Sequence, residues 1–311
     1  MELPINQIVQ GDVIEVLRTL PSESIDCIIT SPPYFGLRDY GIEGQVGLED
    51  TIEEYLDKML AITAECRRVL KKTGTMFWNH GDCYGGIMQS NWTSKNPEIA
   101  RKYQKNASQP NSFMQGKKKG YEKSLLLQAH RLVIRMCDEQ QWILRNTLIW
   151  WKPNSMPTSV IDRFNVDYEP IFFFTKNKKY FFNQQLEDSI WARHDKRFIK
   201  GPSQGGKAVS GNYAINKGGA FRDDAKRNMR SVWYIPTKSY SEAHFATFPQ
   251  ELCEIPIKAG CPENGIVLDP FMGSGTTAFV AKLLNRNYIG IELNPEYIKL
   301  AKDRLAQQKL L

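Results

Sequence analysis

The segment from residue 267 to residue 277 reads Val267-Leu268-Asp269-Pro270-Phe271-Met272-Gly273-Ser274-Gly275-Thr276-Thr277. The run Gly265–Asp269 predicts a strand before it, and the pattern that follows predicts a helix over Thr276–Leu284. Two glycines allow a sharp turn and a close approach to a ligand, and a helix start offers free N–H groups. The segment therefore predicts a strand-loop-helix unit whose loop binds a small molecule.

A second acid supports this interpretation. Glu292 ends the next predicted strand, Asn287–Glu292. A carboxylate at this spacing suits the ribose hydroxyls of a nucleoside held at the edge of an α/β sheet. The P-loop pattern is absent, and Ala278 stands where a full G-x-G-x-x-G has its third glycine. We therefore expect a nucleoside ligand without a pyrophosphate, and a plain tight turn is the alternative.

Strand and helix patterns alternate along the rest of the chain, with no internal repeat. Thr51 and Glu54 form an N-terminal capping pattern for one helix, and Gly74 is expected to end it. The alternation predicts an α/β fold, a parallel sheet covered by helices on both faces. Besides the elements already named, we expect strands at 25–30, 75–78, 144–151 (buried) and 169–174, and helices at 51–70, 125–139, 248–260 and 295–308.

A second motif, Thr30-Ser31-Pro32-Pro33-Tyr34, follows the strand at 25–30. Two prolines stop a strand, and this could be their whole role. The motif also suits an aromatic amine, because the Ser31 hydroxyl and the Pro32 carbonyl can accept its two hydrogens while its ring stacks on Tyr34. Acceptors placed out of the ring plane would favour a tetrahedral nitrogen with a lone pair free to attack.

Charge is unevenly distributed along the 311 residues. The formal net charge is +7, but residues 85–130 hold eight Lys or Arg against two Glu, and residues 176–240 hold fourteen against five acids. The remainder is acidic. Two basic inserts on an acidic scaffold indicate a polyanionic partner, and solvated surface loops are the alternative.

Several classes of protein are not indicated. Apolar runs are too short to span a bilayer, and Met1-Glu2-Leu3-Pro4 lacks a signal-peptide pattern. The six cysteines show no zinc-ligand spacing, and the four histidines are scattered, so we expect free thiols of a reducing cytoplasm and no metal site.

Together, Ser-Pro-Pro-Tyr and Asp-Pro-Phe-x-Gly-x-Gly resemble the motifs of amino-directed DNA methyltransferases that use S-adenosyl-methionine. The order of the motifs resembles the permuted β class, in which a target-recognition region lies between them. The resemblance covers most of the chain and implies a Rossmann-like class I methyltransferase sheet. It implies a catalytic half at 1–175 with a basic insert at about 85–123, a recognition region at 176–240, and a cofactor-binding half of the same domain at 241–311.

The resemblance also assigns site residues. Ser31, Pro32, Pro33 and Tyr34 would hold a flipped-out base. Asp12 resembles the family's adenine-contacting acid ahead of the first strand, and residues 244–249 resemble the segment that wraps the methionine end of the cofactor. Trp151-Lys152-Pro153 and Tyr168-Glu169-Pro170 are similar to a block ahead of the recognition region. The expected cofactor-binding residues are Asp12, Thr30, His244, Thr247, Pro249, Asp269, Phe271, Gly273, Gly275, Thr276 and Glu292.

Family members with serine in this motif mostly methylate cytosine N4, and those with aspartate mostly methylate adenine N6. We therefore expect transfer to cytosine N4 in double-stranded DNA, with adenine N6, an RNA base or a protein amide as alternatives. A nonenzymatic DNA-binding protein is disfavoured because both motifs are intact. Carbon-5 methylation is disfavoured because it needs a nucleophilic thiolate and no Pro-Cys pair occurs. A restriction endonuclease partner and a monomeric or homodimeric state are compatible with the family.

Overall fold

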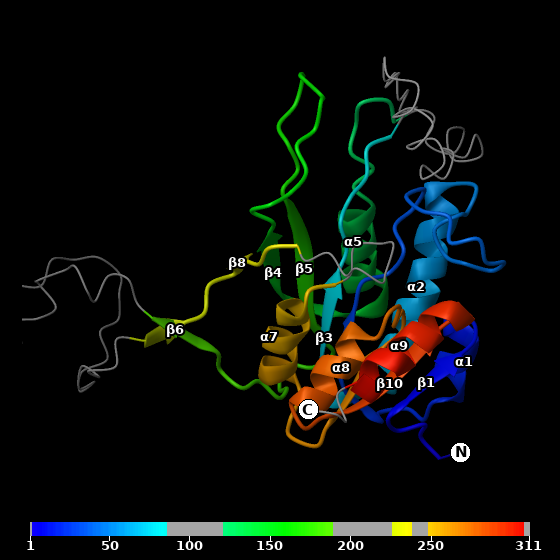
Figure 1. Ribbon diagram of the computed structural model, residues 1–311, viewed down its shortest axis with the longest axis vertical. Coiled ribbons are helices and arrows are strands. Elements are labelled where there is room, and N and C mark those ends of the chain that lie inside the picture. Colours follow the sequence, from blue (N-terminus) through cyan, green and yellow to red (C-terminus); the bar gives the residue numbers. More distant parts are fainter. Residues whose placement is uncertain (1, 86–120, 189–225, 238–247, 308–311) are drawn as a thin grey trace, which may run out of the picture. The chain divides into compact units, whose positions relative to one another are not determined.

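The structure, a computed structural model, describes residues 2–85, 121–188, 226–237 and 248–307 (Figure 1). The chain divides into two units, one made of Met1–Asn183 and Ser231–Leu311 and the other of Gln184–Arg230. In the described part of the second unit, β6 (Leu186–Asp188) and β7 (Lys226–Asn228) form an antiparallel pair. Glu187 joins this pair by ion pairs to Arg227 at 2.9 Å and Arg230 at 2.7 Å.

In the described residues of the first unit, eight strands form one sheet in the order β1-β10-β9-β2-β3-β5-β4-β8. The central strands are nearly continuous apolar runs, as expected for strands covered on both faces. The strands are β1 (Gln7–Gln10), β2 (Ile25–Thr30), β3 (Leu70–Asn79), β4 (Ile143–Trp151), β5 (Tyr168–Thr175), β8 (Val232–Tyr234), β9 (Ile266–Asp269) and β10 (Asn287–Glu292).

The sheet is mixed, whereas a parallel sheet was predicted. β5 runs antiparallel to both β3 and β4, and the other paired strands of this sheet are parallel. The reason is the connection. A loop over residues 152–167 joins β4 to β5 directly, and such a connection returns the chain antiparallel without the helix that a parallel crossover needs. The α/β fold class itself is confirmed.

Two groups of helices pack against the sheet (Figure 1). In one group α2 contacts both α1 and α5, and in the other α8 contacts both α7 and α9. Their apolar stripes supply much of the core, as with the fully buried Tyr55, Met59 and Ile62 of α2. The helices are α1 (Val13–Thr19), α2 (Ile52–Val69), α5 (Gln128–Gln140), α7 (Gln250–Gly260), α8 (Thr276–Leu283) and α9 (Pro295–Gln307).

Local expectations held at α2 and failed at its end. The Thr51 hydroxyl accepts from the Glu54 N–H at 3.1 Å, and the Glu54 carboxylate accepts from the Thr51 N–H, so the predicted capping box is present. Gly74 does not end the helix. The helix ends at Val69, and β3 begins at Leu70 and continues through Gly74, which packs against the Leu70 side chain.

Two further expectations about strands were wrong. The strand at 144–151 was expected to be buried, but residues 144–147 are exposed and only Leu148 and Trp150 are buried. On the edge of β4 away from β5, the neighbouring strand β8 is only three residues long and pairs only with residues 149–151, so residues 144–147 have no strand beside them there among the described residues. Asp12 was expected to lie ahead of the first strand, but β1 precedes it. This strand has only four residues, which is too few to give a clear pattern in the sequence.

The cysteines match the expected free thiols. Five are buried, and Cys137 is partly buried, with no disulfide among them. Among the described helices, none has the length and apolar character that crossing a membrane requires.

Candidate active site

A cavity of about 360 Å³ lies where β2, β9 and β10 end. These strands are parallel, so the residues that follow them meet at one edge of the sheet. Both motifs singled out in the sequence therefore share one cavity. The expected site residues that line it are Asp12, Ser31, Pro32, Pro33, Tyr34, Asp269, Phe271, Gly273, Thr276 and Glu292.

The remaining expected residues have other positions. Thr30 is buried behind the cavity, Gly275 is the N-cap residue of α8, and Pro249 is buried at the start of α7, and none of the three lines the cavity. His244 and Thr247 lie outside the described residues. The described residues on either side of that segment, Thr237 and Phe248, both line the cavity.

Asp269 ends β9 and is almost completely buried. Its Oδ1 accepts from the Thr30 hydroxyl at 2.7 Å and the Phe271 N–H at 3.0 Å, and its Oδ2 accepts from the Thr277 hydroxyl at 2.6 Å. Burial raises the pKa of this carboxyl to about 6, against the lowering effect of these hydrogen bonds. Asp269 thus joins β2, the loop after β9 and α8, and holds the cavity wall in place.

Glu292 ends β10 and faces the same loop. Its Oε2 accepts from the Gly273 N–H at 2.8 Å, and its Oε1 accepts from the Asn294 N–H at 2.8 Å. Burial raises the pKa of this carboxyl as well. Each oxygen keeps further lone pairs, so Glu292 can still accept from ligand hydroxyls.

The loop between β9 and α8 needs glycine at its end. Gly275 has a φ of +81°, and a Cβ there would lie 2.7 Å from the Ala301 Cβ of α9. An L side chain would strain the backbone and collide with α9. Gly273 has a φ of +52° and no neighbour at that position. The loop can therefore approach a ligand closely on the cavity side.

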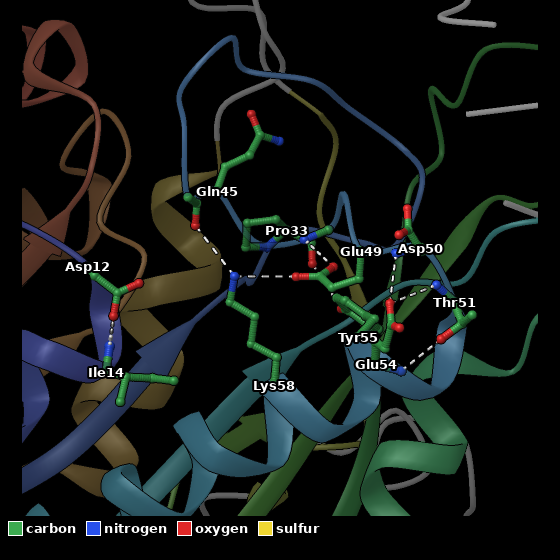
Figure 2. Close-up of polar contacts among 12 residues, drawn as sticks. Asp12, Ile14, Pro33, Gln45, Glu49, Asp50, Thr51, Glu54, Tyr55 and Lys58 are labelled. Carbon is green, nitrogen blue, oxygen red and sulfur yellow. Dashed lines mark hydrogen bonds and ion pairs between the residues drawn. The ribbon is translucent and has the colours of Figure 1, made fainter. Parts of the chain in front are cut away.

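Asp12 has a structural role that the sequence interpretation did not include. Its Oδ1 accepts from the Ile14 N–H at 2.8 Å and the Glu15 N–H at 3.1 Å, so it is the N-cap of α1 (Figure 2). It also lines the cavity. Its proposed contact with a nucleoside base remains a prediction.

The Ser-Pro-Pro-Tyr motif follows β2 and is contacted by side chains of α2. The Tyr55 hydroxyl donates to the Pro33 carbonyl at 2.9 Å, and Lys58 lies 3.5 Å from the Glu49 carboxylate in the loop that follows the motif. Figure 2 shows both side chains pointing from α2 toward this loop. The position of the motif therefore depends on a helix that begins almost 20 residues later.

Three residues beside Tyr34 were given no role from the sequence. The Tyr34 hydroxyl donates to Glu169 Oε2 at 2.9 Å, and Glu169 forms an ion pair with Lys152. The His80 ring is stacked on the Tyr34 ring with a centroid distance of 5.2 Å. Glu169 and Lys152 lie in segments that resemble a block of the family, and this resemblance was the one sign that they belong to the site. Nothing in the sequence indicated a contact of His80 with Tyr34.

The charge of the cavity decides which ligand fits. Lys152 is already paired with Glu169. An excess of carboxylates disfavours a phosphate and suits the cationic sulfonium of S-adenosyl-methionine, while Glu292 suits its ribose. The residues present thus fit this cofactor. Among the described residues, the charged lining comprises Asp12, Glu169, Asp269, Glu292, Arg38 and Lys152.

Other chemistries find little support in the described residues. Burial raises the pKa of the Cys27 thiol to about 12, so this cysteine is not a ready nucleophile. No group of three or more His, Cys, Asp or Glu side chains there is arranged to hold a metal ion.

Comparison with known proteins gives a consistent result. A family profile described as DNA methylase, for N6 and N4 methyltransferases, matches residues 25–303. The type II methyltransferase M.XycI of Xanthomonas campestris pv. cyanopsidis is 41% identical over 96% of this chain and 87% of its own length. The type II methyltransferase M.SmaI of Serratia marcescens is 37% identical over 97% of this chain and 91% of its own.

Solved structures share the fold. PvuII DNA methyltransferase, described as cytosine-N4-specific, superposes with a TM-score of 0.63 at 20% identity, covering 96% of this chain and 85% of that one. A DNA modification methylase from Thermus thermophilus, solved with S-adenosyl-L-methionine, has a TM-score of 0.57 at 23% identity, covering 96% and 94%. With both motifs lining one cavity and the profile matching most of its length, this chain belongs to the DNA methylase family of S-adenosyl-methionine-dependent amino-methyltransferases.

Proposed function

We propose that this protein transfers a methyl group to the exocyclic N4 of cytosine in double-stranded DNA. The observation that carries the proposal is the position of Ser31, directly after β2, in the cavity that Asp269 and Glu292 also line. Serine at this place in the motif favours cytosine. The description of the PvuII enzyme as cytosine-N4-specific supports the same choice.

The target amine is a poor nucleophile, because its lone pair is delocalised into the base. The Ser31 hydroxyl and the Pro32 carbonyl accept its two hydrogens and favour a pyramidal nitrogen. The Tyr34 ring holds the plane of the base, so the lone pair keeps one direction. This catalysis is electrostatic and geometric and needs no covalent intermediate.

When bound, S-adenosyl-methionine supplies a methyl group made electrophilic by its sulfonium. Glu292 would accept from the ribose hydroxyls of the cofactor, and the loop between β9 and α8 that contains Gly273 would lie against the cofactor. Asp269 connects the two motifs, because it accepts from Thr30, which precedes Ser31, and from Thr277 in α8. One carboxylate thus connects the segment proposed to hold the amine with the segment proposed to hold the cofactor.

A cytosine inside a duplex hides its amino group, so the nucleotide must rotate out into the cavity. We assign the two basic segments, 85–123 and 176–240, to contacts with phosphates and base edges. Most of the basic residues of these two segments lie outside the described residues. The names of the type II relatives support a role in site-specific modification opposite a restriction endonuclease.

The test is product identity. The purified protein is incubated with unmethylated DNA and S-adenosyl-methionine, and the digested nucleosides are separated by mass spectrometry. N4-methylcytosine is expected. N6-methyladenine would replace the proposed target with the adenine alternative, and the absence of both despite tight cofactor binding would favour an RNA or protein-amide substrate.

A further inference from the structure

The hydroxyl of Tyr34 is held by a carboxylate from β5, which lies two strands away from β2 in the sheet. Glu169, the second residue of β5, accepts from the Tyr34 hydroxyl at 2.9 Å through Oε2. Its Oε1 pairs with the ammonium of Lys152, which directly follows β4. β4 and β5 are antiparallel with Trp150 opposite Glu169, so the register places Lys152 and Glu169 together at the same edge.

Lys152 is itself fixed. Its ammonium lies 4.3 Å from the centroid of the Trp150 ring, a cation–π contact. Trp150 is buried, and its indole N–H donates to the Ile235 carbonyl at 2.7 Å. The side chains of Lys152 and Glu169 are only 18% and 20% exposed. The carboxylate that meets Tyr34 is therefore held in one orientation by partly desolvated partners.

One face of the Tyr34 ring is covered by His80, with an angle of 24° between the two rings. The Trp78 indole N–H donates to His80 Nδ1 at 3.3 Å, so the ring proton of a neutral His80 lies on Nε2, 3.1 Å from the Tyr55 hydroxyl. Burial lowers the pKa of His80 to about 3 and keeps it neutral. A stacked base is thus directed to the opposite face of Tyr34.

Space is tight around this arrangement. At Gly81 a Cβ would lie 2.9 Å from Tyr34 Cε2 and 3.2 Å from Glu169 Cγ. Glycine at this position lets the Tyr34 ring and the Glu169 side chain both approach the backbone. The tyrosine is therefore fixed at its hydroxyl, at one face and at one edge.

We propose that Glu169, oriented by Lys152, is a positioning residue that fixes the Tyr34 ring for stacking with the target base. The proposal rests on the proposed role of Tyr34 in holding that base. Because Lys152 balances its charge, Glu169 acts through the Tyr34 hydroxyl and contributes little to cofactor affinity.

A double-mutant cycle tests this proposal with the full-length protein. Tyr34→Phe removes only the hydroxyl, and Glu169→Gln removes the charged acceptor. Each is expected to lower kcat for methyl transfer by about 10- to 100-fold, because a misplaced ring no longer holds the base for attack. The double variant should be no slower than the slower single variant, and the dissociation constant of S-adenosyl-methionine should change less than about threefold in all of them.

The readout is total methyl transfer from labelled cofactor to DNA, so it does not depend on which base is modified. A wrong target base would thus overturn the proposed function and leave this test intact. Glu65→Gln is the matched control, because Glu65 is 21% exposed, pairs with Arg68 at 2.7 Å and does not line the cavity. It should keep the parent rate.

Additive losses in the cycle, or an unchanged rate in Glu169→Gln, would overturn the proposal. If Glu169→Gln does not fold, as judged by its thermal unfolding, Lys152→Gln takes its place in the cycle. It should give the same lack of additivity with Tyr34→Phe, and additivity there would again overturn the proposal.

Discussion

At the scale of single residues, Asp269 links the chemistry of the two motifs. It was expected to contact the cofactor, and it does line the cavity. Its carboxylate is also the acceptor for two buried hydroxyls and one backbone N–H. Its first role in the structure is therefore to hold Thr30, Phe271 and Thr277 in fixed positions relative to one another.

The pKa of Asp269, about 6, predicts a pH dependence of cofactor binding. Above pH 6 the carboxyl is ionised and favours a cationic ligand. Below pH 6 it gains a proton and loses that attraction. The affinity for S-adenosyl-methionine is expected to fall by up to about tenfold from pH 7 to pH 5, measured by titration calorimetry. S-adenosyl-homocysteine lacks the positive charge of the sulfonium and should show a smaller change, and equal pH profiles for both ligands would contradict this expectation.

Removing one hydroxyl from this network should be costly. Thr277→Val keeps the shape of the side chain but leaves Asp269 Oδ2 without its partner at 2.6 Å. The free energy of unfolding is expected to fall by about 1–3 kcal/mol, measured by urea denaturation. Thr277→Ser keeps the hydroxyl and is the control. A valine variant as stable as the serine variant would show that the hydrogen bond contributes nothing.

At the scale of elements, α2 supports the Ser-Pro-Pro-Tyr motif. Its capping box fixes where the helix begins, and Tyr55 and Lys58 follow within the first two turns (Figure 2). Thr51→Ala should lower the free energy of unfolding by about 1 kcal/mol, because the Glu54 N–H loses its acceptor. Thermal and urea unfolding measure this loss. Thr51→Ser should unfold like the parent protein, and an equal loss in both variants would point to packing instead of capping.

The elements that the sequence predicted well are those with a strong local signal. Thr51 and Glu54 marked the start of α2, and the glycine segment marked the link between β9 and α8. Gly74 was misleading because a glycine can end a helix or allow close packing inside a strand, and the sequence does not distinguish these roles. The antiparallel β5 depended on a long loop whose path no local pattern reveals.

The site divides in the same way. Ser31, Tyr34, Asp269 and Glu292 could be singled out because each lies at or shortly after the end of a predicted strand, and all four line one cavity. The partners of Tyr34 were not predicted, because strand pairing brings them to it: His80 follows β3, which pairs with β2, and Glu169 lies in β5, which pairs with β3. These contacts join residues that are far apart in the sequence, by 135 positions for Tyr34 and Glu169, and carry no local signature.

At the scale of the whole molecule, charge separates the chain into two roles. Residues 85–130 and 176–240 are basic and the rest is acidic, in keeping with a cavity that favours a cationic cofactor. If six phosphates are neutralised on binding, the logarithm of the DNA association constant should fall with the logarithm of salt concentration with a slope of about −5.

Replacing Lys117, Lys118 and Lys119 by glutamine tests the first basic segment. The slope should become shallower by up to about 3, and fluorescence anisotropy over a salt series measures it. Replacing three acidic-region lysines, Lys282, Lys299 and Lys302 of α8 and α9, is the control and should leave the slope unchanged. Equal effects from both sets would remove the reason for assigning DNA contacts to this segment.

We propose that methyl transfer takes place in the cavity around Ser31. The most direct test is the single-turnover rate of Ser31→Ala with saturating DNA and S-adenosyl-methionine, each bound as tightly as in the parent protein. A rate at least about 100-fold lower is expected, because one acceptor for the amine is lost. A rate within a few-fold of the parent's would contradict it.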